Sequence, residues 1–350
     1  MKIQFCGAAQ EVTGSAHLIT LDDGYKILLD CGLYQGGDDD MSQFNSEWLF
    51  DPSDINVLVL SHAHIDHCGR IPKLVKDGFK GNIYCTYATR DLSGILLMDS
   101  AQIQERDAEY INKVYKKKGQ SNRKKKEPLY TLPDVTFAMQ QFVSIGYERW
   151  FKIHDNVEVL FRDAGHILGS ASVTLKIKEK GRQIMFGFTG DIGRPNRPIL
   201  KDPIRMPRLD YVISESTYGD RVHLATPGEE EKFLKTLQHT CVDKRGKLII
   251  PAFSVGRTQE VVYLMNKLYN EKKLPKIPVF VDSPLAVSAT EIFLSHPECF
   301  DDELNNYMQK DDNPFGFKEL QYIRKVEASK ALNQINGPCI IISASGMANA

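Results

Sequence analysis

The chain has 350 residues, which is enough for two domains or for one large domain with an insertion. Hydrophobic residues make up 42 % of it and charged residues 25 %, a composition typical of a globular protein that can bury a core. The formal net charge of −1 excludes a global basic field, so any contact with nucleic acid has to use local patches.

The apolar segments and the cysteines indicate the compartment. No apolar run is long enough for a signal peptide or a membrane-spanning helix, so we expect no membrane partner. The seven cysteines are scattered without C-x-x-C pairs, which predicts free thiols in a reducing cytoplasm rather than disulfides. We interpret Cys68 as a small packing residue rather than a metal ligand.

Residues 1–208 are rich in short strands, with two helical stretches between them. Asp23-Gly24 separates two alternating runs and predicts a hairpin turn. Helices are expected at residues 70–76 and 89–117. The expected strands cover residues 2–5, 16–21, 26–30, 57–60, 82–86, 142–145, 149–153, 157–161, 172–177 and 183–188. A sandwich of two sheets flanked by helices would satisfy this pattern.

Three of the nine histidines of the chain lie within six positions, directly after the expected strand at residues 57–60. Residues two apart in an extended segment project to the same side, so the imidazoles of His62 and His64 can reach one ion. Asp66 and His67 follow as the chain turns into a helix, and they would face a neighbouring ion. Imidazole and carboxylate are ligands for a borderline divalent cation, most simply zinc. The segment therefore predicts a metal site.

The run at residues 116–126 carries seven positive charges in eleven positions, which stands out in a chain of nearly neutral overall charge. One interpretation is a solvated loop, as most charge runs are. The other is a lip that contacts a phosphate backbone. The sequence favours neither interpretation over the other.

From about residue 209, strands and helices alternate along the chain. Strands are expected at residues 210–215, 247–250, 278–281 and 339–342, and helices at 226–242, 258–270 and 285–294. The first of these helices begins with a capping box from Thr226 to Glu229, with Pro227 at its first position. Alternation with short connections indicates a parallel three-layer α/β domain. The sequence thus predicts one domain over residues 1–208 and a second over residues 209–350.

The histidine-rich segment resembles the H-x-H-x-D-H signature of the metallo-β-lactamase superfamily. Three further landmarks of that fold stand in the expected order, namely Asp30 at the end of an early strand, a later histidine, His166, and Asp191 after a further strand. The resemblance implies an αββα sandwich for the first domain. It also makes Asp30 a carboxylate that orients a ligating imidazole, whereas the plainer interpretation is a turn former before Gly32.

The second domain resembles the β-CASP module of a nuclease family, and the resemblance covers nearly the whole chain. Glu215, in Ser-Glu-Ser-Thr-Tyr-Gly-Asp, matches the acidic residue that ends the first motif of that module. Residues 251–260, 282–286 and 343–347 match three further segments. The chain is most similar to bacterial and archaeal relatives of the cleavage-and-polyadenylation endonuclease. The resemblance implies a zinc-dependent ribonuclease that hydrolyses phosphodiester bonds of single-stranded RNA in RNA processing or decay.

The same resemblance implies two zinc ions per chain and a hydroxide that both ions activate. The implied metal ligands are His62, His64 and His166 for one ion, Asp66 and His67 for the other, and Asp191 as the bridge between them. Glu215 would orient or assist a proton donor to the leaving group. The implied catalytic residues are therefore Asp66, Asp191 and Glu215.

Strand ends of the second domain suit an anionic oxygen, because parallel α/β sheets place ligands where their strands end. The candidates for phosphate or RNA contacts are Ser254, Gly256, Arg257, Ser343, Ser345 and Gly346. They offer hydroxyl groups, unencumbered backbone N–H groups and one guanidinium group. The alternative is that these serines and glycines only cap helices.

The end of the chain departs from the family pattern. The family places two more histidines after the segment at 343–347, one near the leaving group and one at the second zinc ion. This chain ends at Ala350 without a later histidine. We therefore expect an incomplete β-CASP domain, a second metal site that lacks a ligand, and weak or absent catalysis.

Two other functions stay open on the sequence alone. One is a small-molecule metallo-hydrolase of the lactamase or glyoxalase kind, and the other is a non-catalytic RNA-binding scaffold. The sequence separates neither RNA from single-stranded DNA nor an endonuclease from a 5′-exonuclease. It also leaves open whether the chain forms a homodimer.

Overall fold

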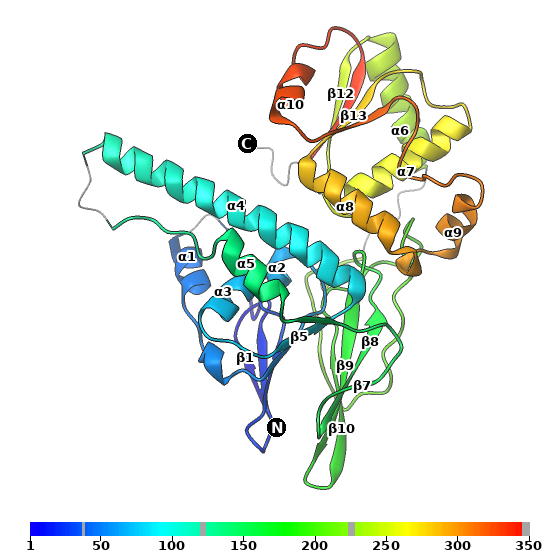
Figure 1. Cartoon of the computed structure of the whole chain (residues 1–350). Coiled ribbons are helices and arrows are strands. Elements are labelled where there is room, and N and C mark those ends of the chain that lie inside the picture. Colours follow the sequence, from blue (N-terminus) through cyan, green and yellow to red (C-terminus); the bar gives the residue numbers. More distant parts are fainter. Residues whose placement is uncertain (37–38, 120–123, 223–227, 345–350) are drawn as a thin grey trace. The chain divides into compact units, whose positions relative to one another are not determined.

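The computed structural model describes residues 1–36, 39–119, 124–222 and 228–344 (Figure 1). The chain forms two compact units. Unit 1 comprises Met1–Pro195 and Asp202–Thr217, and unit 2 comprises Asn196–Lys201 and Tyr218–Ala350. The predicted domain boundary at residue 208 falls within the second part of unit 1 and stays a prediction.

Unit 1 contains two sheets built from short aliphatic strands. The first has the order β1-β2-β3-β4-β5-β6, antiparallel from β1 to β3 and parallel from β3 to β6. Its strands are β1 (Lys2–Phe5), β2 (His17–Thr20), β3 (Lys26–Leu29), β4 (Val57–Val59), β5 (Asn82–Cys85) and β6 (Phe142–Ser144). The second has the order β11-β10-β9-β8-β7 and is antiparallel except for the pair of β10 with β11. Its strands are β7 (Phe151–His154), β8 (Val157–Asp163), β9 (Ala171–Glu179), β10 (Arg182–Phe188) and β11 (Tyr211–Ile213).

The two sheets share an apolar core. Leu29 and Val59 of the first sheet belong to the same buried cluster as Phe161, Val173 and Phe186 of the second. Successive side chains of a strand face opposite sides, so the strands of the first sheet can bury both faces. The predicted sandwich of two sheets is therefore present, and its core is largely apolar.

Helices cover the other face of the first sheet. Leu28 and Leu58 point away from the second sheet and pack in a cluster with Leu74 and Leu97, which lie on two of these helices. The helices of unit 1 are α1 (Asp39–Ser46), α2 (Ile65–Cys68), α3 (Ile71–Lys76), α4 (Tyr87–Lys117) and α5 (Leu132–Met139), with a 3-10 turn at Pro52–Asp54. The sequence patterns predict neither α1 nor α5, which have only eight residues each.

Unit 2 is built around one parallel sheet with the order β12-β15-β13-β14. Its strands are β12 (Lys247–Pro251), β13 (Val279–Asp282), β14 (Leu320–Ile323) and β15 (Cys339–Ser343). Its helices are α6 (Glu229–Leu237), α7 (Arg257–Asn270), α8 (Pro284–Ser295), α9 (Asp302–Met308) and α10 (Val326–Leu332), with a π-helical turn at Gln238–Asp243 and a 3-10 turn at Pro297–Cys299. The predicted α/β class is confirmed for both halves. Thr226 and Pro227 lie outside the described residues, so the capping box stays a prediction.

Two general predictions can be compared with the structure. All seven cysteines lie in the described residues; none forms a disulfide, in line with the predicted thiols, and all are buried. Among the helices of the described residues, none combines the length and the apolar character needed to cross a lipid bilayer.

Candidate metal centre

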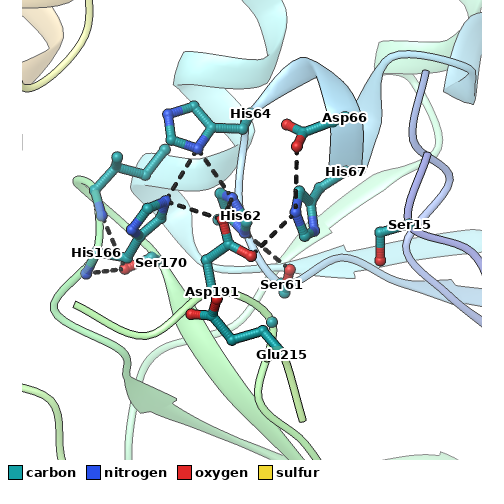
Figure 2. A network of polar contacts seen from close by, with 12 residues as sticks. Ser15, Ser61, His62, His64, Asp66, His67, His166, Ser170, Asp191 and Glu215 are labelled. Carbon is teal, nitrogen blue, oxygen red and sulfur yellow. Dashed lines mark hydrogen bonds and ion pairs between the residues drawn. The ribbon is translucent and has the colours of Figure 1, made fainter. Parts of the chain in front are cut away.

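The metal-binding motif lies where β4 ends. Beyond β4 the chain reaches His64 with φ −59° and ψ 144°, and α2 then begins and carries Asp66 and His67. Two loops of the second sheet complete the group: His166 lies between β8 and β9, and Asp191 follows β10. Figure 2 shows these side chains turned toward one another.

The first cluster of donor atoms comes from four side chains. His64 Nδ1 lies 3.1 Å from His62 Nε2 and 3.1 Å from His166 Nε2. Asp191 Oδ2 lies 3.3 Å from His166 Nε2 and 3.8 Å from His62 Nε2. One ligand atom from each of the four lies within 4.8 Å of the others. Three imidazole nitrogens and one carboxylate oxygen therefore converge on a single point (Figure 2).

A second group of donors lies against the other oxygen of Asp191. Asp191 Oδ1 is 3.3 Å from His67 Nε2, and His67 Nε2 is 3.9 Å from Asp66 Oδ2. The two oxygens of Asp191 thus face different groups, Oδ2 the first cluster and Oδ1 the side chain of His67. A carboxylate whose two oxygens face different groups of donors can act as a ligand shared by two ions.

Asp30 fixes the orientation of His67 from behind. The Asp30 side chain is fully buried and follows β3. Its Oδ2 accepts a hydrogen bond from His67 Nδ1 at 2.7 Å and from the Ser15 hydroxyl at 3.2 Å, and its Oδ1 accepts one from the Ser61 backbone N–H at 2.8 Å. Asp30 therefore holds a proton on His67 Nδ1 and turns Nε2 toward Asp66 and Asp191.

Ser61 connects Asp30 to His62 and thereby sets the tautomer of the His62 ring. Its hydroxyl donates to Asp30 Oδ2 at 2.9 Å and lies 3.0 Å from His62 Nδ1. Because the hydroxyl proton goes to the carboxylate, the serine oxygen can accept the Nδ1 proton of His62. The lone pair of His62 is then on Nε2, which is the atom in the first cluster.

Burial keeps the two central imidazoles neutral. It lowers the pKa of His62 well below its usual value and that of His64 to about 3, and neighbouring imidazoles lower both further. For Asp191, burial raises the pKa, but hydrogen bonds from His166 and His67 outweigh it and hold the pKa far below the ordinary value. Neutral imidazoles and an ionised carboxylate are the protonation states that a metal cation requires.

The donors fit a divalent cation of the zinc class. Three imidazole nitrogens this close together cannot all be satisfied by hydrogen bonds among themselves, because a single proton serves only one of the 3.1 Å contacts of His64. Zinc binds imidazole nitrogen at about 2.0–2.1 Å, which places two nitrogens of a tetrahedral site about 3.3 Å apart. The observed separations are close to that value, so a cation at their centre would replace the missing protons.

Hydrogen bonds hold the loop that carries His166, both at His166 itself and near its end at Gly169. The Ser170 hydroxyl accepts hydrogen bonds from the backbone N–H groups of His166 at 3.0 Å and Ile167 at 3.2 Å. The Gly169 carbonyl accepts one from the Thr86 hydroxyl at 2.6 Å and another from the Thr89 hydroxyl at 2.8 Å. The first turn of α4 therefore holds the loop in place.

Glu215 lies in the exposed loop after β11, close to Asp191 (Figure 2). Its Oε1 accepts a hydrogen bond from the Ile192 backbone N–H at 2.8 Å, and its own N–H donates to the Thr189 hydroxyl at 3.2 Å. Glu215 thus fastens the loop on which Asp191 sits. A cavity of about 520 Å³ borders His67, Asp191 and Glu215, and its wall includes Phe5 and Ser15.

Several positioning residues are absent from the sequence-based predictions. Ser61 could have been found from its place between strand β4 and His62, where a hydroxyl can reach a ring nitrogen. Ser15 and Ser170 carry no such signal, because only the folded chain brings them to Asp30 and to the His166 loop.

The predicted phosphate contacts of unit 2 lie at one edge of its sheet. Ser343 of β15 is in register with Pro251 of β12 and with Asp282 of β13, so the carboxyl ends of these strands are level. Just beyond them, the hydroxyls of Ser254 and Ser283 lie 3.2 Å apart. Parallel sheets bind ligands at such an edge.

Two of these candidates are already engaged inside the chain, and two cannot be placed. The Gly256 N–H donates to Gln259 Oε1 at 2.7 Å, so in this conformation it is not the unencumbered group that the sequence suggests. Arg257 is half-exposed and forms an ion pair with Glu260 at 2.8 Å. Ser345 and Gly346 lie outside the described residues.

Comparison with known proteins agrees with this geometry. The model of the metallo-β-lactamase superfamily matches residues 9–238, and that of the Beta-Casp domain matches residues 258–350. A ribonuclease of Thermus thermophilus is 34% identical over 348 residues, which are 99% of this chain and 73% of that protein. An RNase J-like protein of Methanocaldococcus jannaschii is 31% identical over 99% of this chain and 71% of its own length.

A third relative is longer. The transcription termination factor FttA of Methanosarcina mazei is 32% identical over 100% of this chain, but this chain spans only 52% of it. The superfamily model covers more than half of the residues and includes every donor described above. This chain therefore belongs to the metallo-β-lactamase superfamily and carries a β-CASP domain.

Proposed function

We propose that this chain is a metal-dependent nuclease that hydrolyses phosphodiester bonds of RNA. The observation that carries the proposal is the division of the Asp191 carboxylate between two groups of donors, Oδ2 with His62 and His166 and Oδ1 with His67. Such a pair of sites suits in-line displacement at phosphorus, in which both the attacking and the leaving oxygen need stabilisation. The names of two similar proteins, a ribonuclease and an RNase J-like protein, support RNA as the substrate.

We propose zinc as the metal and two ions per chain. His62, His64, His166 and Asp191 would hold one ion, and Asp66, His67 and Asp191 would hold the other. When bound, the ions would supply Lewis acidity to the phosphodiester and lower the pKa of a water molecule. The remaining steps depend on residues of the chain itself.

The chain contributes orientation and charge at this site. Asp30 and Ser61 lie against Nδ1 of His67 and His62, so the Nε2 atoms of both rings are turned inward, where they would bind a cation. Asp66 and Asp191 place negative charge beside the reacting atoms, which balances the cations that bind there. No side-chain nucleophile is required, because water can attack the phosphorus.

Glu215 has two roles in this proposal. Its hydrogen bond from the Ile192 N–H holds the residue that follows Asp191, which positions the bridging carboxylate. Its exposed carboxylate also borders the cavity beside His67 and can orient a proton donor toward the leaving oxygen. The proposed catalytic residues are therefore Asp66, Asp191 and Glu215.

The phosphate contacts of unit 2 remain part of the proposal. The level strand ends, the paired hydroxyls of Ser254 and Ser283, and the half-exposed Arg257 support a site for a phosphate of the RNA strand. Ser343 shares this edge. Single-stranded RNA is the preferred form, because an extended strand presents its phosphates separately.

Cleavage of labelled nucleic acid tests the proposed function. The chain is incubated with 5′- and 3′-labelled single-stranded RNA and DNA, with and without a chelator, and its zinc content is measured by elemental analysis. Weak cleavage of RNA that stops with chelator is expected. Asp191→Asn and His64→Ala should each lower the rate by more than about 100-fold, since residues that only orient metal ligands already contribute about 10–100-fold.

Matched controls use the same residue types elsewhere in unit 1. His154→Ala removes a histidine that stacks on Tyr25, and Asp155→Asn changes an exposed carboxylate, so both should cleave RNA at the unmodified rate. Turnover of a β-lactam or thioester without any RNA cleavage would contradict the proposal. So would full activity of Asp191→Asn.

Four finer points accompany this function. Comparing the labelled ends of the products separates an endonuclease from a 5′-exonuclease, and comparing RNA with DNA sets the sugar preference. Light scattering after size-exclusion chromatography tests whether the chain forms a homodimer. The predicted cytoplasmic location is tested by cell fractionation.

A further inference from the structure

Helix α4 extends well beyond the core of unit 1. It has 31 residues, which corresponds to about 46 Å at 1.5 Å per residue. Its last buried residue is Ala108, so its final turns are not part of the core. Figure 1 shows this end of α4 projecting away from the two sheets of unit 1.

The projecting end carries two groups of three lysines, which we call the basic tip: Lys116–Lys118 and Lys124–Lys126. All six side chains are exposed. The first group closes α4, and the second lies on the chain segment that returns toward the core. Within the described residues, Lys116, Lys117 and Lys118 form no ion pair with a carboxylate, whereas Lys113, one turn earlier, pairs with Glu109.

Hydrogen bonds hold the returning segment against α4. Asn112 donates from Nδ2 to the Lys126 carbonyl at 2.8 Å and accepts from the Lys126 N–H at 2.8 Å. Further along, Gln104 Oε1 accepts from the Leu129 N–H at 3.1 Å, and the Tyr130 hydroxyl donates to Ser100 at 2.8 Å. The two lysine groups are therefore built onto one support rather than spread along a free loop.

The opposite end of α4 lies at the metal centre. Thr86, the N-cap residue, and Thr89 in the first turn donate to the Gly169 carbonyl, three residues after His166. One rigid helix therefore connects the loop of a metal donor with the basic tip. The length of that helix sets the separation of the two sites at roughly 46 Å.

A purely structural role explains only part of the tip. Cations in the last turn stabilise a helix by interaction with its dipole, which accounts for Lys116 and Lys117. It does not account for Lys124–Lys126, which lie outside the helix. Six like charges held together are unfavourable for folding unless a polyanion binds there.

We propose that the basic tip binds the phosphate backbone of an RNA strand whose scissile bond lies at the metal centre. This inference rests on the proposed function. A strand that follows α4 would need about 14 nucleotides to reach the tip at a rise of 3.4 Å per nucleotide, and fewer if it is stretched. The exposed side chain of Tyr110 on the same end of α4 offers a face on which a base can stack. The tip would thus favour long substrates over short ones.

Binding measurements at several salt concentrations test the tip. Dye-labelled RNAs of 6 and 30 nucleotides are titrated with protein in the presence of EDTA, which prevents cleavage. The triple variants K116Q/K117Q/K118Q and K124Q/K125Q/K126Q each remove three charges. For the 30-mer, each should reduce the slope of log K against log salt by about 2, because a single strand contributes about 0.7 per phosphate contact. Cleavage of the 6-mer with metal present should keep its unmodified rate.

Two control proteins isolate the effect of position and charge. K2Q/K80Q/K178Q removes the same charge from other exposed lysines of unit 1 and should leave the slope unchanged. K124R/K125R/K126R keeps the charge and should bind the 30-mer like the unmodified chain. Circular dichroism verifies that α4 is intact in every variant.

The outcomes separate this inference from the proposed function. Unchanged salt slopes in both tip variants would overturn the inference that the tip binds RNA. An equal reduction of the slope in K2Q/K80Q/K178Q would also overturn it. Tip-dependent binding to phosphatidylserine vesicles with no tip-dependent RNA binding would overturn it in favour of a membrane surface. If the unmodified chain cleaves no RNA, the proposed function fails, whereas the salt slopes, which need no cleavage, still decide whether the tip binds RNA.

Discussion

Asp30 occupies a fully buried position. Hydrogen bonds from Ser15, Ser61 and His67 surround its carboxylate. Its backbone has φ +57°, a conformation that costs a residue with a side chain about 1–2 kcal/mol. A strained, buried acid is retained here because it sets the protonation of two imidazoles at once.

Asp30→Asn should weaken metal binding. The amide keeps the size of the side chain, but its NH2 group faces donors that need an acceptor, so His67 loses its fixed tautomer. We expect a loss of about 10–100-fold in zinc affinity, measured by competition with a chromophoric chelator. Asp54→Asn, which changes a half-exposed carboxylate paired with Lys26, is the control and should bind zinc normally. Equal affinities of both variants would contradict the role of Asp30.

The individual metal donors are more predictable from sequence than the residues that orient them. His62, His64, Asp66 and His67 stand out because their spacing is local, and a strand followed by a short helix brings them together. His166 and Asp191 required the family resemblance, since they are far away in the sequence. Ser170 could not be predicted, because its contact depends on a loop whose path only the folded chain fixes.

At the scale of elements, the loop between β8 and β9 shows how a backbone conformation positions a donor. Gly169 has φ +81°, and an added Cβ would lie 2.5 Å from the Thr89 backbone nitrogen. Only glycine permits the loop to approach the first turn of α4 this closely. The position of His166 therefore depends on the absence of a side chain three residues later.

Gly169→Ala should destabilise unit 1 and lower its metal affinity. The left-handed conformation alone costs about 1–2 kcal/mol, and the contact with α4 adds to that cost. Chemical denaturation measures the stability, and chelator competition measures the affinity. Gly181→Ala has a similar φ of +72° with open space around the added Cβ, so its smaller effect gives the conformational cost alone. If the two variants behaved alike, the close approach to α4 would be unimportant.

Long or strongly patterned elements are predictable, and short ones with mixed exposure are not. The pattern predicts α4 from residue 89, and the structure begins it at Tyr87, because the Thr86 hydroxyl accepts the Thr89 N–H. Strand β14 has only four residues and no fully buried side chain, so its pattern is too short to indicate a strand from the sequence. Its place in the sheet comes from pairing with β13.

At the scale of the whole molecule, the two units have separate cores, and every proposed metal donor belongs to unit 1. A ligand stabilises only the part of a protein to which it binds. Zinc should therefore affect the thermal unfolding of one unit and leave the other unchanged.

Two core substitutions test this separation. Phe161→Ala in unit 1 and Phe293→Ala in unit 2 each remove a fully buried ring, and each should cost about 3–5 kcal/mol. Calorimetry should show two unfolding transitions, and each variant should lower the midpoint temperature of one of them. Added zinc should raise the midpoint temperature of the transition that Phe161→Ala affects. It should leave the midpoint temperature of the other transition unchanged. A single unfolding transition, with a midpoint temperature that both variants lower and zinc raises, would contradict this prediction.

The burial of all seven cysteines has a practical consequence. No native sulfur is available to a maleimide dye, so one engineered surface thiol would become the sole labelling position. Glu109→Cys would place a fluorophore about two turns before the basic tip, on a side chain that is 71 % exposed. The emission of that fluorophore would then follow the arrival of a nucleic-acid strand in real time, without background from the rest of the chain.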